Sequence, residues 1–164
     1  MKAVYDLPEQ HANVLSLLVA RISPTAHGWA LTGSAGLRLQ GVDLSVHDLD
    51  LQTDAKTIYL LEKDLAEFIK VPVHVWETEH TRSYHGQAEI HGLQVELLGD
   101  VRHRGADGAW GAPLDIRSVL VWVEWHGLEV PVLSLAHEAL AYEKMERKQK
   151  AELIRAVIRK EIYD

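Results

Sequence analysis

The sequence predicts an α+β domain: a mixed sheet that carries acidic residues, flanking helices, and a helical tail at the C-terminus. Short stretches with strand-like alternation of apolar residues are interspersed with stretches in which apolar residues recur at helical spacing. The dipeptides His91-Gly92 and His126-Gly127 each separate two strand-like stretches, which indicates hairpins. We therefore expect a single domain over residues 1–164, with a core over about 1–132 and a helical tail over about 133–164.

Helical segments are predicted where apolar residues share one face. They lie at residues 8–22, 35–39, 54–69, a segment that begins after Ser134, and a final helix that carries Leu153–Ile158. Asp54 and Ser134 are placed as N-caps, and Gly41 ends the short second helix. The basic residues 147–150 are expected to break the tail into two helices.

Strands are predicted at residues 29–32, 46–52, 71–76, a hairpin within 83–100, and a second hairpin within 119–132. Residues 99–113, which are rich in glycine, are expected to form a loop.

Composition excludes several classes of protein. The chain has no cysteine, which excludes disulfides and thiolate zinc sites, and no apolar run approaches the roughly 20 residues of a membrane span. A net charge of −7 argues against a general nucleic-acid coat, although residues 144–160 are locally basic and leave an RNA end open as a partner. A cytoplasmic protein without membrane contact is therefore expected.

One constellation could serve phosphoryl chemistry. Gly33-Ser34, at a strand end, offers backbone N–H groups and a hydroxyl to phosphate oxygens. Asp48 and Asp50, two residues apart on a strand, project from the same face, and Glu96 stands among apolar residues on a later strand. Three carboxylates of this kind suit two magnesium ions in nucleotidyl transfer, and the third acid can also accept the proton of the nucleophile.

The stretch Gly33-Ser34, Arg38, Gly41 and His47-Asp48-Leu49-Asp50-Leu51 resembles the signature of the nucleotidyltransferase superfamily that shares the palm of DNA polymerase beta. It looks most like small bacterial members, the lincosamide nucleotidyltransferases and the abortive-infection nucleotidyltransferase toxins. The resemblance extends to residues 95–100, which are similar to the strand with the third acid, and to the tail at residues 130–147.

The resemblance implies a function and a set of site residues. The function is transfer of an NMP unit from an NTP, with ATP the expected nucleotide, to a hydroxyl of a small molecule, protein or RNA, with Mg²⁺ or else Mn²⁺ as the metal. The implied catalytic and metal-binding residues are Asp48, Asp50 and Glu96, and the implied nucleotide-binding residues are Gly33, Ser34, Arg38 and Lys144.

Two departures from the family pattern support an alternative function. The third acid is Glu96 where Asp is commoner, and the Lys-Asp pair that follows the tail lysine in the family appears here as Lys150-Ala151. A nucleotide-binding module with weak or no turnover, acting on a protein partner as antitoxins do, is therefore the second hypothesis. Asp100 is the rival third acid, and His47 is interpreted as a packing residue because it points to the opposite strand face.

Overall fold

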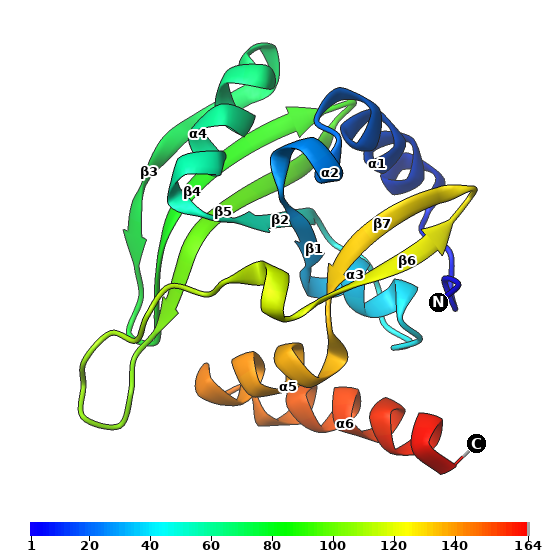
Figure 1. Ribbon diagram of the computed structural model, residues 1–164, viewed down its shortest axis with the longest axis vertical. Helices are drawn as coiled ribbons and strands as arrows, with labels where there is room; N and C mark the ends of the chain where they lie inside the picture. The colour runs from blue at the N-terminus through cyan, green and yellow to red at the C-terminus, as the bar shows by residue number, and fades with distance from the viewer. Residues whose placement is uncertain (164) are drawn as a thin grey trace.

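The computed structural model describes residues 1–163, which form six α-helices and two short 3₁₀ turns around one sheet (Figure 1). The helices are α1 (Glu9–Arg21), α2 (Pro24–His27), α3 (Gly33–Leu39), α4 (Ala55–Asp64), α5 (Leu135–Lys144) and α6 (Lys148–Tyr163). The 3₁₀ turns are η1 (Ala66–Phe68) and η2 (Ile116–Ser118).

Seven strands form a single mixed sheet in the order β3-β4-β5-β2-β1-β7-β6. They are β1 (Ala30–Thr32), β2 (Leu49–Thr53), β3 (Ile69–Glu77), β4 (Thr81–Ile90), β5 (Leu93–His103), β6 (Leu120–Trp125) and β7 (Leu128–Leu133). The pairs β2·β5 and β1·β7 are parallel, and the other neighbours are antiparallel. The α+β class with a mixed sheet is thus confirmed.

Local sequence explains the turns and caps. His91 and Gly92 have φ values of 50° and 78°, and His126 and Gly127 have 48° and 75°. Two successive positive φ values suit the tight turn that matches the twist of antiparallel strands. The Asp54 carboxylate accepts a hydrogen bond from the Thr57 N–H at 2.7 Å, as expected of an N-cap.

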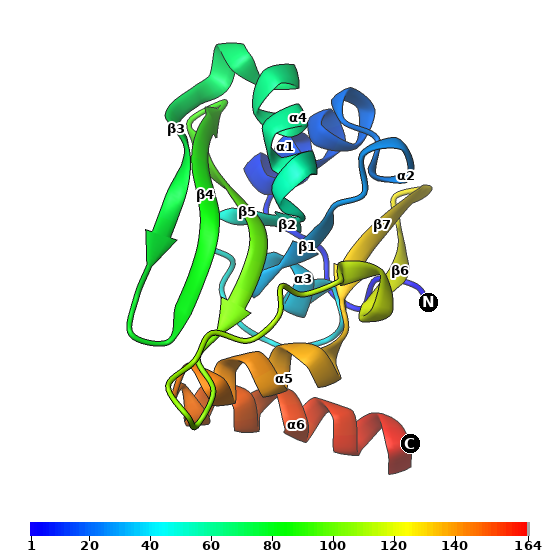
Figure 2. The ribbon, with the colours of Figure 1, turned by 60° about the vertical axis from the view of Figure 1, so that its left-hand side comes forward.

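Two apolar cores hold the layers together. The larger core packs α1 and α4 onto the central strands, with Leu15, Leu51 and Leu97 among its fully buried members. The second core joins α3 to the helical tail through residues such as Leu37, Tyr142 and Ile154. Consequently α5 and α6 lie side by side beneath the sheet, at the opposite end of the molecule from α1 and α4 (Figures 1 and 2).

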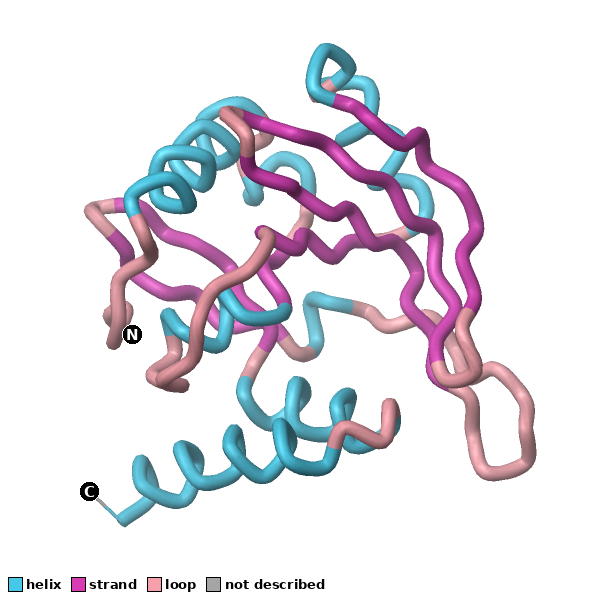
Figure 3. Tube along the Cα trace, turned by 180° about the vertical axis from the view of Figure 1, so that it is seen from behind, coloured by secondary structure: helices cyan, strands magenta, loops and turns pink. Residues whose placement is uncertain are grey.

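The structure corrects several predicted boundaries. The fourth helix ends at Asp64 rather than near Ile69, because the 3₁₀ turn and strand β3 take the remaining residues. Strand β5 runs on to His103, so the loop predicted from residue 99 begins later; this loop projects beyond the strand ends (Figure 3). A short helix, α2, forms where only the end of the first helix was expected.

Within residues 1–163, none of the helices is long and apolar enough to cross a membrane.

Candidate active site

Asp50 and Glu96 lie directly opposite each other in the parallel ladder between β2 and β5. On the other side of β2, Asp50 is opposite Thr32, the last residue of β1. Side chains at opposed positions of neighbouring strands project from the same face of a sheet. The sheet therefore brings the two predicted acids to one row, although they are far apart in the chain.

Gly33 lets the start of α3 approach this row closely. Its φ is +70°, and a Cβ at this position would overlap the Oδ2 atom of Asp50. Any other residue would therefore meet both a backbone penalty and a collision with a carboxylate. The buried Ser34 hydroxyl accepts a hydrogen bond from the His47 N–H at 3.1 Å, which fixes the segment that leads into Asp48.

The carboxylates differ in their electrostatic surroundings. Burial, followed by repulsion from Glu96 and Asp48, raises the pKa of Asp50 to about 7. Burial and the charge of Glu96 also raise the pKa of Asp48. Interaction with the His85 imidazole, opposed by burial, lowers the pKa of Glu96, whose Oε1 accepts a hydrogen bond from Gln94 Nε2 at 2.8 Å. Glu96 is therefore the acid that is held ionised, whereas burial and the neighbouring carboxylates favour the neutral form of Asp50.

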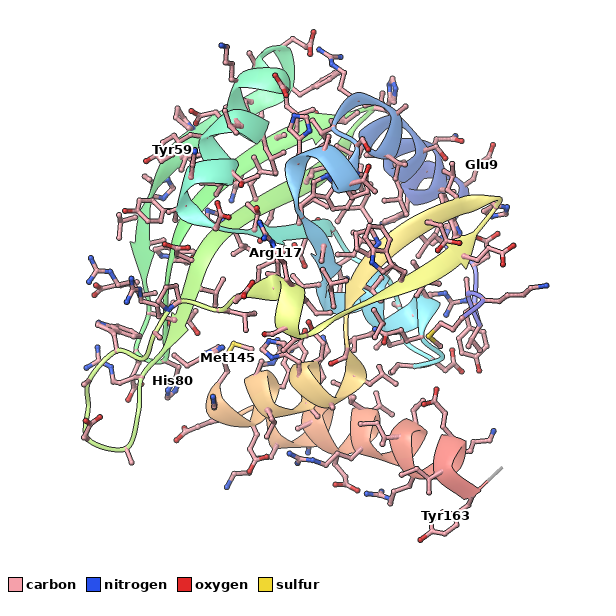
Figure 4. All side chains as sticks on the ribbon, in the orientation of Figure 1. Glu9, Tyr59, His80, Arg117, Met145 and Tyr163 are labelled. Atoms are coloured by element: carbon pink, nitrogen blue, oxygen red, sulfur yellow. The ribbon has the colours of Figure 1, made fainter. Side chains whose placement is uncertain are left out.

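A cavity of about 380 Å³ opens over Asp50 and Glu96, between the sheet and α5, and the predicted Asp48 is not in its lining. Its floor includes Gly33, Asp50 and Glu96, and its far end reaches Met145 at the end of α5. Figure 4 labels Met145, directly after α5, and His80, in the β3–β4 turn. The Nε2 atom of His80 lies 3.8 Å from a carboxylate oxygen of Glu146. A further set of residues completes the lining: Thr32, Gln52, Trp76, Thr81, Leu98, Val101, His103, His137, Glu138, Ala141, Tyr142 and Arg147.

The family resemblance extends to the whole fold. A family model described as aminoglycoside-2''-adenylyltransferase matches residues 14–156. The chain belongs to this family. The crystal structure of TM1012 from Thermotoga maritima, a protein provisionally assigned as a nucleotidyltransferase, is 37% identical with a TM-score of 0.83, over 96% of this chain and 98% of that one. The lincomycin-bound lincosamide adenylyltransferase LnuA shares the fold at 11% identity and a TM-score of 0.56, over 93% of this chain and 99% of that one. No curated protein sequence matches the chain.

Two residues of this adenylyltransferase-family chain that the sequence did not single out for the site lie in or beside the cavity. Glu138, on α5, is buried and accepts a hydrogen bond from the Thr32 hydroxyl. Burial raises its pKa to about 7, and the Thr32 hydroxyl and the Gly33 N–H partly offset that effect. An acid on the apolar face of a helix that also carries Leu135 and Ala139 is the signal that could have identified Glu138.

Lys150, on α6, is the second. Its Nζ lies 4.7 Å from the centre of the Tyr142 ring. Burial and the charge of Arg147 lower its pKa, while attraction to Glu138 and Asp50 opposes that shift. The ammonium group is therefore close enough to interact with acids of the site. The sequence signal that could have identified Lys150 is its position, because Lys150-Ala151 stands where the family has a Lys-Asp pair.

The remaining predicted residues lie elsewhere. The Arg38 guanidinium donates to the carbonyl oxygens of Asp6 and Leu44, at 2.7 and 3.3 Å, and is not in the lining of the cavity. Lys144 is exposed at the end of α5. Burial first, and then the charge of Lys144, lower the pKa of His103 and of His137, two residues of the lining. Asp100, the rival acid, accepts a hydrogen bond from the Ala55 N–H at 3.0 Å and so secures the start of α4.

The family resemblance implies a divalent metal, so the predicted ligands can be compared with what such a metal requires. Asp48, Asp50 and Glu96 offer only hard carboxylate oxygens, the ligands that magnesium prefers. Burial, followed by repulsion from Glu96 and Asp48, raises the pKa of Asp50, and a bound cation would offset both effects. In the described part of the chain, however, no three His, Asp or Glu side chains are gathered into a finished metal-binding group. The residues fit the metal in chemistry, and Asp50 and Glu96 line the same cavity, whereas Asp48 lies just before β2 and outside that lining.

Proposed function

We propose that this protein is a magnesium-dependent adenylyltransferase that moves AMP from ATP to a hydroxyl group. The observation that carries the proposal is the row of Asp50 and Glu96 on adjacent parallel strands, with Gly33 packed against Asp50. The same arrangement supports nucleotide binding and transfer at one place, because Gly33, Asp50 and Glu96 line a single cavity.

The roles of the residues follow from their chemistry. Asp48, Asp50 and Glu96 would hold the metal, which supplies charge neutralisation for the phosphates and the departing diphosphate. The Gly33-Ser34 backbone would bind phosphate oxygens. Lys150 would add a cation from the side of the helical tail, because its ammonium group is attracted to Glu138 and, more weakly, to Asp50. Lys144 stays a second candidate for that role.

Transfer requires a nucleophile and a leaving group on opposite sides of the α-phosphorus. The turn at Gly33 lies on the β1 side of Asp50, and Glu96 lies on the β5 side. We assign the diphosphate to the Gly33 side and the acceptor hydroxyl to the Glu96 side. The acceptor oxygen forms the new bond to the α-phosphorus as the bond to the diphosphate breaks. Glu96, which is held ionised, takes the hydroxyl proton, and the diphosphate leaves with the electron pair.

The first acceptors to test are suggested by the relatives. The description of the matching family model names the 2'' position of an aminoglycoside, and the structure of LnuA contains lincomycin. We therefore propose an assay with ATP, Mg²⁺ and a panel of aminoglycosides and lincosamides, followed by a hydroxyl-bearing protein and an RNA end. Diphosphate release together with an acceptor heavier by one adenylyl group is the expected result, and D50N is the inactive control. Failure of ATP with Mg²⁺ to raise the melting temperature, together with the absence of product, would contradict the proposal.

A nucleotide-binding module without turnover is the second candidate. It is favoured by the open arrangement of the acids within residues 1–163 and by the Glu96 and Lys150-Ala151 departures. Tight ATP binding, no diphosphate release with any acceptor, and co-purification with a protein partner would support it. Transfer to a single acceptor would exclude it.

A further inference from the structure

His85, on β4, is a buried histidine directed at Glu96. Only 3% of its surface is exposed, and its Nε2 lies 3.6 Å from Oε2 of Glu96. This nitrogen is buried and has no hydrogen-bond partner within 3.5 Å. A buried polar nitrogen without a partner is costly, so the carboxylate just beyond hydrogen-bond distance is its natural acceptor.

The position of His85 follows from the register of the sheet. Glu96 is opposite Gln87, and His85 is opposite Leu98, two residues further along β5. His85 is therefore the diagonal neighbour of Glu96 on the same face, a separation that a long side chain can span.

Aromatic neighbours hold the imidazole in place. The Trp76 ring packs edge-on at a centroid distance of 4.9 Å, and the His74 ring does so at 5.8 Å. A ring packed in this way loses little additional freedom when it makes a hydrogen bond.

Glu96 needs such support more than an aspartate would. A glutamate has one more rotatable bond, so its carboxylate samples more positions. Gln94 Nε2 already donates to Oε1 at 2.8 Å, and His85 faces the other oxygen. Gln94 and His85 thus each face one oxygen of the Glu96 carboxylate.

We propose that His85 is a positioning residue for nucleotidyl transfer: its Nε2–H holds Oε2 of Glu96 while Gln94 holds Oε1, which lets a glutamate serve as the third acid. The inference rests on the proposed function. His85 touches neither the nucleotide nor the acceptor and acts through Glu96.

The kinetic test compares two substitutions at one position. His85→Met removes the donor but fills the space, and His85→Gln keeps a donor near the site of Nε2. We expect H85M to lower kcat about tenfold or more with the KM for ATP within about twofold, and H85Q to stay within about threefold of the wild type. Glu89→Gln, at an exposed residue of the same strand that has no contact with His85, is the control and should leave kcat within about twofold.

A second measurement does not depend on turnover. Side-chain ¹⁵N spectra of wild-type protein should show His85 protonated at Nε2, and that signal should shift in Glu96→Gln but not in Glu89→Gln. Wild-type transfer with an unchanged kcat in H85M, or an Nε2 signal that is insensitive to Glu96→Gln, would overturn the role of His85 alone. The absence of transfer by the wild type with every acceptor would overturn the proposed function and this role with it.

Discussion

Asp50 and Glu96 are paired in the parallel ladder between β2 and β5, and their surroundings shift their pKa values in opposite directions. The pKa of Asp50 is raised to about 7, whereas that of Glu96 is lowered. The Glu96 carboxyl is thus held in its ionised form, whereas the neutral form of the Asp50 carboxyl is favoured. The predictions below test the parts of the site around this pair.

Asp50→Asn should abolish transfer and yet stabilise the metal-free protein. The folded state binds a proton at Asp50 more tightly than the unfolded state, whose pKa is near 3.8. The stability that Asp50 contributes is therefore complete below pH 3.8 and is lost as the pH rises through about 7. We expect D50N to raise the melting temperature by about 3 °C or more at pH 8, with a smaller gain at pH 5. Mg²⁺ should raise the melting temperature of the wild type and not that of D50N.

The exposed Glu89 provides the control for that experiment, as E89Q changes a carboxylate on the same sheet without touching the site. Equal melting temperatures of D50N and wild type at pH 8 would show that Asp50 is not strained in the metal-free protein.

Comparing Gly33→Ala with Gly127→Ala should separate the cost of a positive φ from the cost of a steric overlap with Asp50. Both Gly33 and Gly127 have positive φ, at 70° and 75°, but only at Gly33 would a Cβ overlap another residue, Asp50. G127A should cost only the backbone penalty of about 1 kcal/mol, and G33A should cost more and also remove most transfer activity. Thermal unfolding and the transfer assay measure the two effects. Equal stability and full activity of G33A would mean that α3 need not approach Asp50.

Arg38→Ala decides between the predicted phosphate role and a structural one. The guanidinium bridges the carbonyl oxygens of Asp6 and Leu44, so its loss should lower stability by about 1 to 2 kcal/mol. We expect the KM for ATP to change by less than about twofold. A tenfold rise in KM at unchanged stability would instead support phosphate binding. R159A, on the exposed face of α6, is the matched arginine control.

The two tail lysines can be compared directly. The charge of Lys150 interacts with the carboxylates of Asp50 and Glu138, whereas the charge of Lys144 acts on the imidazoles of His103 and His137. We expect Lys150→Met to raise the KM for ATP about tenfold, and Lys144→Met to raise it less than about threefold. Titration with ATP and Mg²⁺ by calorimetry gives the same comparison without turnover. The reverse order would return the nucleotide role to Lys144.

Much of the fold was accessible from local patterns. Asp54 and Ser134 were predicted as caps from residue type, and both accept the expected backbone hydrogen bonds. The two His-Gly turns were predicted from the dipeptide and adopt the required positive φ values. The strand boundaries failed where pairing rather than composition decides, since β5 continues to His103 because β4 pairs with it as far as Thr81.

The sequence by itself determined the signature and part of its local geometry. The two aspartates stand two residues apart in the chain, but only Asp50 lies within a strand, because β2 begins at Leu49 and not at the predicted residue 46. Gly33-Ser34 does follow a strand end as predicted, and Gly33, with a φ of 70°, opens helix α3 there. The family resemblance rests on this local information.

Only the tertiary structure decided which distant residues meet the aspartates. The parallel register places Glu96 beside Asp50, and the packing of α5 and α6 on α3 brings Glu138 and Lys150 to the site. The same packing leaves Arg38 against Asp6, outside the cavity. Strand register and helix orientation are set by contacts between segments far apart in the chain, and no local pattern of residues specifies them.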